Sequence, residues 1–524
     1  MDLARREGNI MQEDRVNLVQ ALDHAVARFG DQIAISGLQG PVTFTEFNRA
    51  SDSVAAALIG MGMEKGQRVG LYCINSEAFA IAYFGIIKCG AIAVPVNLLL
   101  PAAEISYILN DAGVSSVIYH QLFAETVAGL QVPTLQQRIV IGEDATGSAI
   151  PFTSLLATEP ERPNVAFHAH EDIASIIYTS GTTGHPKGAM LSHANLLSNA
   201  HSCRQALQLT PGTDAFLVVL PMFHSFAHTV GMVVPLLHGC RIVPVPKFDA
   251  QLVADTVEKS GATIFMGVPT MYAMLLTLDA TQTPKFASLR YCIAGGAAMP
   301  MSIMDKFESR FGKLIYEGDG PTECSPVTCV NPIGGVRKPG SVGVPVPDVA
   351  MGIRNDQGDP VADNDIGEIC VRGPNVMRGY WQLPEETAQV FFDDWYRTGD
   401  LGYRDSDGYF YIVDRLKDML IVNGMNVYPK MVEDVLYQIP AVQEAAVVGQ
   451  PDEVHGEIPV AHVVLREGEA MSVHDIVSYC KNRLAGFQVP RIIHFSESLP
   501  KTPTGKILKR ELTKRGEWER GIKS

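Results

Sequence analysis

The residues best suited to chemistry lie at 178–188, which read YTSGTTGHPKG and follow the strand-like run IASII at 173–177. Gly181 and Gly184 allow the backbone to approach a ligand closely, and Lys187 adds a positive charge. Four hydroxyl side chains complete the loop: Thr179, Ser180, Thr182 and Thr183. Such a loop suits the oxygens of a polyphosphate. It lacks GxxxxGK followed by Ser or Thr, so P-loop chemistry does not follow, and the closing PKG distinguishes it from an ordinary flexible connector.

Other segments place single polar residues beside small or apolar ones. His224 lies in LPMFHSFA, Asp400 in YRTGDLG and Lys506 in PKTPTGK. A carboxylate such as Asp400 can accept hydrogen bonds from two neighbouring hydroxyl groups, and a lysine can stabilise charge that builds on a reacting phosphate. Each feature alone has a simpler interpretation, because a lone histidine is usually a core residue, TGD is a common turn and a basic tail is usually solvated.

In combination with the loop, these segments resemble the adenylate-forming superfamily, which contains acyl-CoA synthetases, luciferases and peptide-synthetase adenylation domains. The resemblance covers nearly the whole chain and includes GGAAMP (295–300), YEGDGPTE (316–323) and DRLKD (414–418). It implies that the loop binds the β- and γ-phosphates of ATP. The ATP and AMP contacts implied in this way are Thr179, Ser180, Gly181, Thr182, Thr183, Gly184, Lys187, Gly296, Ala297, Glu317, Gly318, Asp319, Gly320, Pro321, Thr322, Asp400, Arg415 and Lys506.

The resemblance also implies a set of catalytic residues. Thr322 would touch the α-phosphate, Glu323 would hold Mg²⁺, and Lys506 would stabilise the carboxylate oxygen and the α-phosphate during adenylation. His224 would border the bound carboxylate. The acyl pocket implied by the same resemblance is formed by His224, Phe226, Gly231, Gly267 and Gly295.

Asp319 departs from the family pattern, in which Tyr or Phe is the commonest residue at this place. An aromatic wall against the adenine is therefore not expected from this side chain. Our hypothesis is that Asp319 interacts with the exocyclic amine of adenine or with a neighbouring side chain.

The reaction implied by the resemblance is that of an AMP-forming acyl-CoA synthetase. A carboxylic acid attacks the α-phosphorus of ATP to give an acyl-adenylate and pyrophosphate, and CoA then displaces AMP. The protein's task is positioning and charge stabilisation, and the lack of a GxSxG elbow agrees with a mechanism without an acyl-enzyme. Small residues beside methionines and phenylalanines favour a medium- or long-chain fatty acid. The alternatives are an aryl or alicyclic carboxylate, an enzyme that loads a carrier protein, and a luciferase-like oxygenase.

The elements that must position these residues follow an α/β pattern. Apolar runs alternate with amphipathic stretches, which predicts parallel sheets covered by helices. The expected strands lie at 68–74, 91–96, 115–119, 215–220 and 263–268. From about residue 340, short β-like runs at 367–372 and 408–413 predict a β-rich subdomain that extends to residue 415.

The change of pattern at DRLKD predicts a boundary between an N-terminal adenylation domain (1–415) and a small mobile α+β C-terminal domain (416–524). The elements expected in the second domain are helices at 429–437 and 473–484 and strands at 442–449 and 460–465. By the resemblance, Lys417 would be the hinge, and Gly424 would mark the point where the pantetheine arm of CoA passes towards the adenylate.

Composition limits the partners and the compartment. The net charge of −15 over 524 residues argues against a nucleic-acid-binding protein, although eight basic residues face three acidic ones in 501–524. Nine cysteines without a CxxC pair, and an N-terminus without a signal-peptide core, predict a reduced, cytoplasmic protein. The apolar run at 78–87 is too short to span a bilayer, so it is expected in the core. Peripheral membrane contact is left open, as is the oligomeric state, for which a homodimer is one option.

Overall fold

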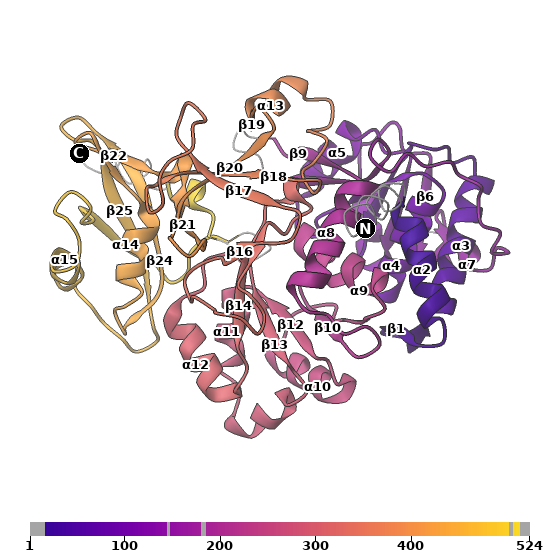
Figure 1. Ribbon diagram of the computed structural model, residues 1–524, viewed down its shortest axis with the longest axis horizontal. Coiled ribbons are helices and arrows are strands. Elements are labelled where there is room, and N and C mark those ends of the chain that lie inside the picture. The colour runs from indigo at the N-terminus through magenta and orange to yellow at the C-terminus, as the bar shows by residue number, and fades with distance from the viewer. Residues whose placement is uncertain (1–15, 144–146, 180–184, 502–506, 514–524) are drawn as a thin grey trace, which may run out of the picture.

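The computed structural model describes residues 16–143, 147–179, 185–501 and 507–513, and within them the chain forms four β-sheets. Figure 1 shows a seven-stranded sheet on the right and the sheet nearest the C-terminus on the left, with the other two sheets between them. Helices cover the two large, mainly parallel sheets. The predicted α/β fold class, with a β-rich part and a small α+β unit, is therefore confirmed.

The seven-stranded sheet has the order β7-β6-β5-β3-β4-β8-β9. Its strands are β3 (Arg68–Tyr72), β4 (Ile92–Pro95), β5 (Ser116–His120), β6 (Gln137–Ile141), β7 (Ile150–Pro151), β8 (Ile173–Thr179) and β9 (Lys187–Ser192). Neighbours run parallel except β8 and β9, which form an antiparallel pair. The helices of this region are α2 (Leu18–Phe29), α3 (Phe44–Gly60), α4 (Glu77–Lys88), α5 (Ala102–Asp111), α6 (Ala124–Ala128) and α7 (Phe152–Leu156). The first three predicted strands are confirmed.

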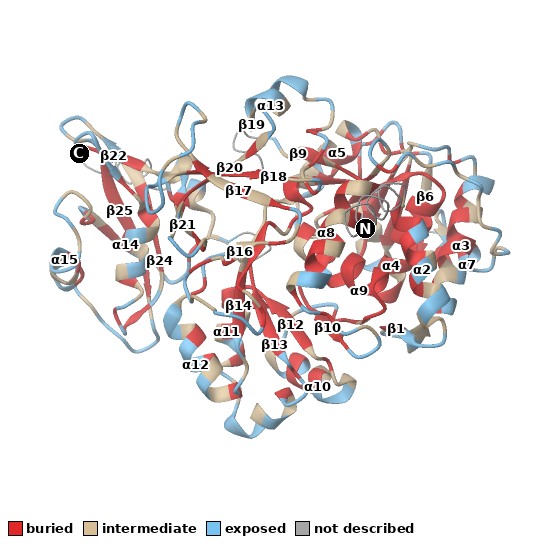
Figure 2. Ribbon diagram, in the orientation of Figure 1, coloured by how far each residue is buried: buried red, intermediate tan, exposed pale blue. Residues whose placement is uncertain are grey.

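The nine-stranded sheet supplies the centre of the molecule. Its strands, in spatial order, are β16 (Val344–Pro345), β15 (Cys329–Val330), β14 (Ile315–Asp319), β13 (Tyr291–Ala294), β12 (Ile264–Gly267), β10 (Ala215–Val218), β11 (Arg241–Pro244), β1 (Ile33–Ser36) and β2 (Pro41–Thr43). Its helices include α8 (His193–Ala206), α9 (Val234–Leu237), α10 (Ala250–Ser260), α11 (Pro269–Leu275) and α12 (Met301–Phe311). Along β12, Phe265 and Met266 alternate between two core clusters, so both faces of the sheet are buried, as Figure 2 shows for the strands between the exposed helix faces.

The β-rich part forms a five-stranded antiparallel sheet. Its strands are β17 (Ala350–Arg354), β18 (Gly367–Arg372), β19 (Phe391–Phe392), β20 (Trp395–Arg404) and β21 (Phe410–Arg415), and α13 (Pro384–Gln389) precedes β19. The strand predicted at 367–372 is confirmed. The strand predicted at 408–413 is shifted to 410–415, because Gly408 has a φ of +86° and lies in a turn that the Asp405 carboxylate closes by accepting a bond from the Tyr409 amide.

The chain leaves this sheet after β21 and enters the last sheet through a short 3₁₀ turn, η5 (Leu416–Asp418). The last sheet contains β22 (Leu420–Val422), β23 (Met425–Val427), β24 (Val442–Asp452), β25 (Gly456–Leu465) and β26 (Ile492–Phe495), with α14 (Pro429–Leu436) and α15 (Val473–Lys481). The predicted helices and strands are present, and β24 and β25 are longer than expected because they continue into one hairpin. The change of sheet falls at the predicted hinge, but the division into domains stays a prediction.

Helix α4 contains the apolar run at 78–87, and all its residues except Ala78 are buried. The run is therefore core, as expected. No helix in the described part of the chain is both long enough and apolar enough to span a membrane.

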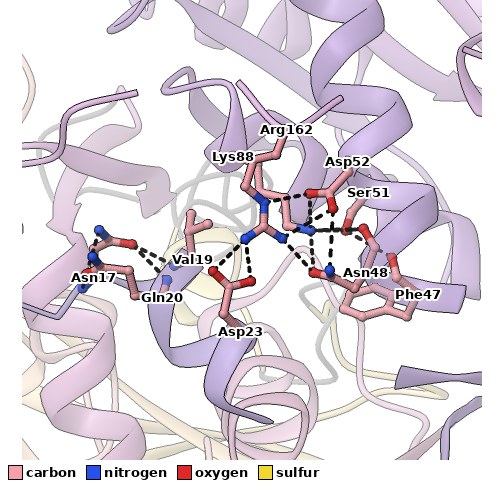
Figure 3. Close-up of polar contacts among 10 residues, drawn as sticks. All are labelled: Asn17, Val19, Gln20, Asp23, Phe47, Asn48, Ser51, Asp52, Lys88 and Arg162. Atoms are coloured by element: carbon pink, nitrogen blue, oxygen red, sulfur yellow. Dashed lines mark hydrogen bonds and ion pairs between the residues drawn. The ribbon is translucent and has the colours of Figure 1, made fainter. Parts of the chain in front are cut away.

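A buried polar cluster forms around Lys88, the last residue of α4 (Figure 3). Its fully buried ammonium group donates hydrogen bonds of 2.7–3.0 Å to three residues of α3: Asn48, Ser51 and Asp52. Arg162 bridges Asp52 and Asp23, which lies on α2. Burial lowers the pKa of Lys88 to about 8, and the nearby Asp52 carboxylate opposes this effect. The cluster ties three helices to the segment after α7.

All nine cysteines are described, and each is a buried free thiol. They occur in every sheet unit, for example Cys73 after β3, Cys292 in β13, Cys370 in β18 and Cys480 in α15. Burial raises the pKa of each thiol, for Cys73 and Cys370 to about 12 and for Cys480 to about 11.

Replacing Lys88 by Met should lower the free energy of unfolding by about 3–5 kcal/mol, because removal of one partner leaves a buried carboxylate with less counter-charge. Urea-induced unfolding measures the loss. Lys285→Met is the matched control, since its partner Asp255 is 50% exposed and such pairs contribute about 0–1 kcal/mol. Equal losses in the two variants would contradict the role assigned to burial.

Candidate active site

The glycine-rich loop is closed at its base by the ends of two paired strands. Thr179 ends β8, Lys187 begins β9, and the two residues face each other in the antiparallel register. The Thr179 hydroxyl donates to the Lys187 carbonyl over 3.4 Å. The remaining residues predicted to bind phosphate lie outside the described part of the chain: Ser180, Gly181, Thr182, Thr183 and Gly184.

The segment 375–381, between β18 and α13, joins this hairpin to the turn that carries Glu323. Three backbone hydrogen bonds of 2.7–2.9 Å connect it to β9: Arg378 to Met190, Met190 to Gly379, and Trp381 to Gly188. Two bonds of 2.7–2.8 Å reach the turn: the Met377 amide to the Glu323 carbonyl, and the Asn375 side chain to the Cys324 carbonyl. No motif predicted this segment, because its partners lie far away along the chain.

Tyr380 extends this junction into the site. Its hydroxyl group donates to Glu323 Oε1 over 2.8 Å, and its ring lies 5.3 Å from the ammonium group of Lys187. Burial and the Glu323 carboxylate raise the pKa of Tyr380, so its phenol stays protonated and remains a donor. Lys187 and Glu323, which were predicted from separate motifs, therefore both contact a residue that sequence reasoning missed.

The segment that carries His224 is fixed against the same turn. The buried Ser225 hydroxyl shares a 2.9 Å hydrogen bond with the Thr322 hydroxyl. Asn75, in the loop before α4, accepts from the Met222 amide over 2.8 Å. Its amide group donates to three carbonyls around the end of β10: Val218, Leu220 and Val245. Sequence reasoning missed Ser225 and Asn75, since their partners lie 97 and 147 residues away.

The glycines of YEGDGPTE have a packing role that needs no ligand. A Cβ on Gly320 would lie 1.9 Å from the Pro326 carbonyl oxygen, so only glycine fits there. A Cβ on Gly318 would lie 2.9 Å from the Cys329 carbonyl oxygen. After Pro321, Thr322 and Glu323 occupy a 3₁₀ turn, η4 (Thr322–Cys324). The tight approach of β14 to the chain at 326–330 thus presents these two side chains at the end of the strand.

Asp400 on β20 and Arg415 on β21 form an ion pair, in which the Asp400 side chain is buried and the Arg415 side chain is exposed. They face each other in the register, and Arg415 Nε lies 2.7 Å from Asp400 Oδ1. Although burial acts in the opposite direction, the carboxylates of Asp400, Asp319 and Glu323 raise the pKa of Arg415. The electrostatic effect of Asp319 on Arg415 is consistent with either form of our hypothesis, which stays a prediction.

The residues predicted for the acyl pocket lie mainly around a π-helical stretch, η2 (Phe226–Val233), which directly follows His224 and Ser225. A Cβ on Gly295 would lie 3.2 Å from the Phe226 ring, and a Cβ on Gly231 would lie 3.1 Å from Val218. Gly267 differs, because its Cβ would point to Phe265 and Tyr272 in the other core cluster. Gly267 can face such a pocket only with its backbone.

Gly296 and Ala297 follow Gly295 in the loop after β13. Gly296 adopts a φ of +79°, and the side chain of Ala297 is exposed. The loop thus offers little side-chain bulk next to the end of the strand.

The predicted hinge and CoA residues lie on exposed turns. Lys417 is in η5, and Gly424 is at the tip of the β22–β23 hairpin, where Asn423 and Gly424 have φ values of +52° and +77°. An Asn-Gly pair with two positive φ values is typical of a tight hairpin turn, which explains the glycine without reference to CoA. Lys506 lies outside the described residues.

Comparisons with known proteins agree with this geometry. The model of the AMP-binding enzyme family matches residues 22–381, and the model of the AMP-binding enzyme C-terminal domain matches residues 431–506. A long-chain-fatty-acid–CoA ligase of Bacillus subtilis is 36% identical over 526 residues, which cover 94% of each chain. A feruloyl-CoA synthase of Amycolatopsis sp is 36% identical over 475 residues, which cover 90% of this chain and 94% of the relative.

Among solved structures, MatB from Rhodopseudomonas palustris is similar to this chain at 30% identity. Its ATP-bound form gives a TM-score of 0.88 and covers 95% of this chain and 99% of the MatB chain. Its apo form gives a TM-score of 0.77, with coverage of 96% and 100%. The present arrangement is thus more similar to the ATP-bound form than to the apo form.

The chain therefore belongs to the family of AMP-binding enzymes. Its activity is that of an AMP-forming acyl-CoA synthetase, an acid–thiol ligase that uses a carboxylic acid, ATP and CoA.

Glu317 is unusual among the predicted site residues, because its carboxyl group is buried although it lies in the middle of β14. Its Oε2 accepts a 2.8 Å hydrogen bond from the Gly340 amide. Burial raises the pKa of Glu317 to about 7, although the Gly340 bond and Arg337 favour the charged form. A group whose pKa is raised on folding stabilises the protein fully below the unfolded pKa and loses this contribution as the pH rises through the folded value.

Glu317→Gln should therefore gain stability relative to the wild type as the pH rises from about 4.5 to about 7.5. A shift from the ordinary value of 4.5 to about 7 corresponds to about 3 kcal/mol at most, and we expect a gain of about 1–3 kcal/mol at pH 8. Urea unfolding at a series of pH values measures the difference between the two proteins. A difference that does not change with pH would contradict the prediction.

Proposed function

We propose that the acid activated by this synthetase is a medium- or long-chain fatty acid. The observation that supports the proposal is the apolar surroundings of Gly231, which packs closely against Val218 and Met266: a Cβ there would lie 3.1–3.5 Å from their side chains. An apolar wall recognises an alkyl chain through burial of its surface. The name of the Bacillus subtilis relative, long-chain-fatty-acid–CoA ligase, points to the same substrate class.

In this proposal the triphosphate lies between the loop at 179–184 and the turn η4. Lys187 binds the β- and γ-phosphates, and Thr322 contacts the α-phosphate. The hydrogen bond between Thr322 and Ser225 supports this assignment, because it holds the Thr322 hydroxyl beside the segment that carries His224. His224 borders the carboxylate, so the acid and the α-phosphorus meet at this place.

In the same proposal, Asp400 and Arg415 contact the ribose of the nucleotide. The Asp400 carboxylate is paired with Arg415, and a carboxylate has enough lone pairs to accept from a ribose hydroxyl as well. Gly296, Ala297 and the backbone at 317–321 line the adenine. Gly296 and Ala297 add little side-chain bulk beside this backbone, which supports the assignment.

Mg²⁺ fits at Glu323. This cation prefers oxygen ligands and keeps several of them from water and phosphates, so one protein carboxylate is sufficient. Glu323 is 8% exposed, and its Oε1 accepts the bond from Tyr380. In the described ranges, no group of three or more His, Cys, Asp or Glu side chains could hold a metal by itself, so the phosphates of ATP complete the site in this proposal. When bound, Mg²⁺ supplies charge neutralisation for the departing pyrophosphate.

We assign the second half-reaction to a rotation of residues 416–524 about Lys417, which withdraws Lys506 and offers the Gly424 hairpin to CoA. The change of sheet between β21 and β22 supports the division of the chain at residue 415. The described residues beside Lys506 are firmly held: Ile507 pairs with Lys501, and Lys509 Nζ lies 2.8 Å from Glu433 Oε1.

An aryl acid is the alternative substrate. The feruloyl-CoA synthase of Amycolatopsis sp, which is 36% identical to this chain, favours this alternative. The ring of Phe226 beside Gly295 could stack on an aromatic acid as well as contact an alkyl chain.

A panel of acids with saturating ATP, Mg²⁺ and CoA tests the substrate class. We expect kcat/KM to rise about fourfold for each added methylene from acetate towards octanoate or palmitate, because each buried methylene contributes about 0.8 kcal/mol. Pyrophosphate and AMP release are the measurements. A maximum on benzoate or ferulate would support the aryl alternative, and no pyrophosphate release with any acid would contradict the proposal as a whole.

Lys506→Ala should slow acyl-adenylate formation by about 100-fold or more, because it removes a charge placed where negative charge develops. Transfer from preformed acyl-adenylate to CoA should change far less, since the lysine is withdrawn in that step. Lys501→Ala, five residues earlier in the same chain segment, is the control for a general effect of lost charge. Equal decreases in the rates of both half-reactions in Lys506→Ala would contradict a specific role of this lysine in adenylation.

A further inference from the structure

The contacts of Tyr380 point to a positioning role that rests on the function proposed above. Tyr380 lies between two groups of opposite charge, with its hydroxyl on Glu323 and its ring facing Lys187. Among the described residues, no ion pair joins Lys187 directly to Glu323. The aromatic ring separates the two charges while it contacts both.

Such a separation matters because a direct ion pair would compete with both ligands. A Lys187–Glu323 pair would withdraw the ammonium group from the phosphates and the carboxylate from the metal. A cation over an aromatic face gains about 0.5–2 kcal/mol without being neutralised, so Lys187 keeps its charge for phosphate.

The hydroxyl group also sets the geometry of the carboxylate. Tyr396 shares a hydrogen bond with Tyr380, and Tyr380 in turn donates to Glu323, so the three side chains form a chain of hydrogen bonds. The phenol occupies one lone pair of Glu323 Oε1, and the carboxylate keeps its other lone pairs for a further ligand. Hydrogen bonds in series strengthen one another in a buried site.

The backbone of Tyr380 is as firmly held as its side chain. Its neighbours Gly379 and Trp381 are bonded to β9, and Ala189 pairs with Tyr380 in an isolated bridge. Tyr380 is 8% exposed, as is Glu323. The backbone position of Tyr380 is therefore fixed, and its side chain contacts both Lys187 and Glu323 from there.

We propose that Tyr380 is a positioning residue that keeps Lys187 and Glu323 apart and orients the Glu323 carboxylate for a divalent cation bound together with the nucleotide triphosphate. The hydroxyl group orients Glu323, the proposed metal ligand, and the ring holds Lys187, the proposed phosphate ligand. Loss of the hydroxyl and loss of the ring therefore have different consequences.

Tyr380→Phe and Tyr380→Leu separate these two parts. Calorimetry with the non-hydrolysable analogue α,β-methylene-ATP, in Mg²⁺ or in EDTA, gives the affinity of each protein for metal-bound and metal-free nucleotide. We expect Tyr380→Phe to weaken binding of the Mg²⁺ complex by about 10-fold, and binding in EDTA by less than about twofold, since groups that orient a metal ligand typically contribute 10–100-fold. Tyr380→Leu should weaken both, because Lys187 and Glu323 can then approach each other.

Tyr411→Phe is the matched control. Tyr411 lies in β21 of the same sheet, its hydroxyl lies 3.3 Å from Asp405, and its ring stacks on Tyr403. Both nucleotide affinities should be unchanged. Tyr396→Phe, which leaves Tyr380 intact and removes its hydrogen-bond partner, should give a smaller loss in the same direction as Tyr380→Phe, and it serves if Tyr380→Phe does not fold.

Equal losses with and without Mg²⁺ in Tyr380→Phe, or no loss in either, would overturn this inference. A wild-type protein that binds the Mg²⁺ complex no better than the metal-free analogue would instead contradict the Mg²⁺ site of the proposed function. A third result is that the wild type retains tighter binding of the Mg²⁺ complex while Tyr380→Phe has the same affinities as the wild type. That result would leave the proposed function intact and would show that Tyr380 has no positioning role in it.

Discussion

The hydrogen bonds of segment 375–381 are the constraint on which the site depends. Thr179 and Lys187 belong to the seven-stranded sheet, whereas Glu323 follows a strand of the nine-stranded sheet, so the residues proposed to bind the triphosphate and its metal start on separate sheets. Backbone hydrogen bonds from this segment to β9 and to Glu323 fix the distance between the two sheets here, because a backbone group cannot change its position by changing rotamer. A segment of the β-rich part thus connects the two large sheets at the candidate site.

Opposite charges are distributed around this segment in pairs. Arg415 is bonded to Asp400, and Lys187 is held apart from Glu323 by Tyr380. The chain as a whole carries a charge of −15, yet a polyanionic substrate needs cations at the place of reaction. In the function proposed above, the two requirements are reconciled because Arg415 and Lys187 each have a partner, Asp400 and the Tyr380 ring, in the absence of phosphate.

The strands were predictable because they depend on local patterns. Apolar runs such as 68–74 and 263–268 identify buried strands without knowledge of the fold, and the strand-like run at 173–177 before the glycine-rich loop lies in β8. Tyr380, Ser225 and Asn75 were not predictable, since their partners lie 57, 97 and 147 residues away and nothing in their own surroundings distinguishes them. The place of Gly267 in the acyl pocket stays a prediction, because the face of a strand on which a glycine would carry a side chain depends on register and not on residue type.

The buried thiols have a practical consequence. A cysteine reacts as its thiolate, and burial both covers these sulfur atoms and raises their pKa values, so they are almost inert while the surrounding structure is closed. Cys73, Cys292, Cys370 and Cys480 lie in four different sheet units. The chain consequently contains at least one natural chemical reporter for each unit, and the rate at which each sulfur is labelled measures the local opening around it without any introduced probe.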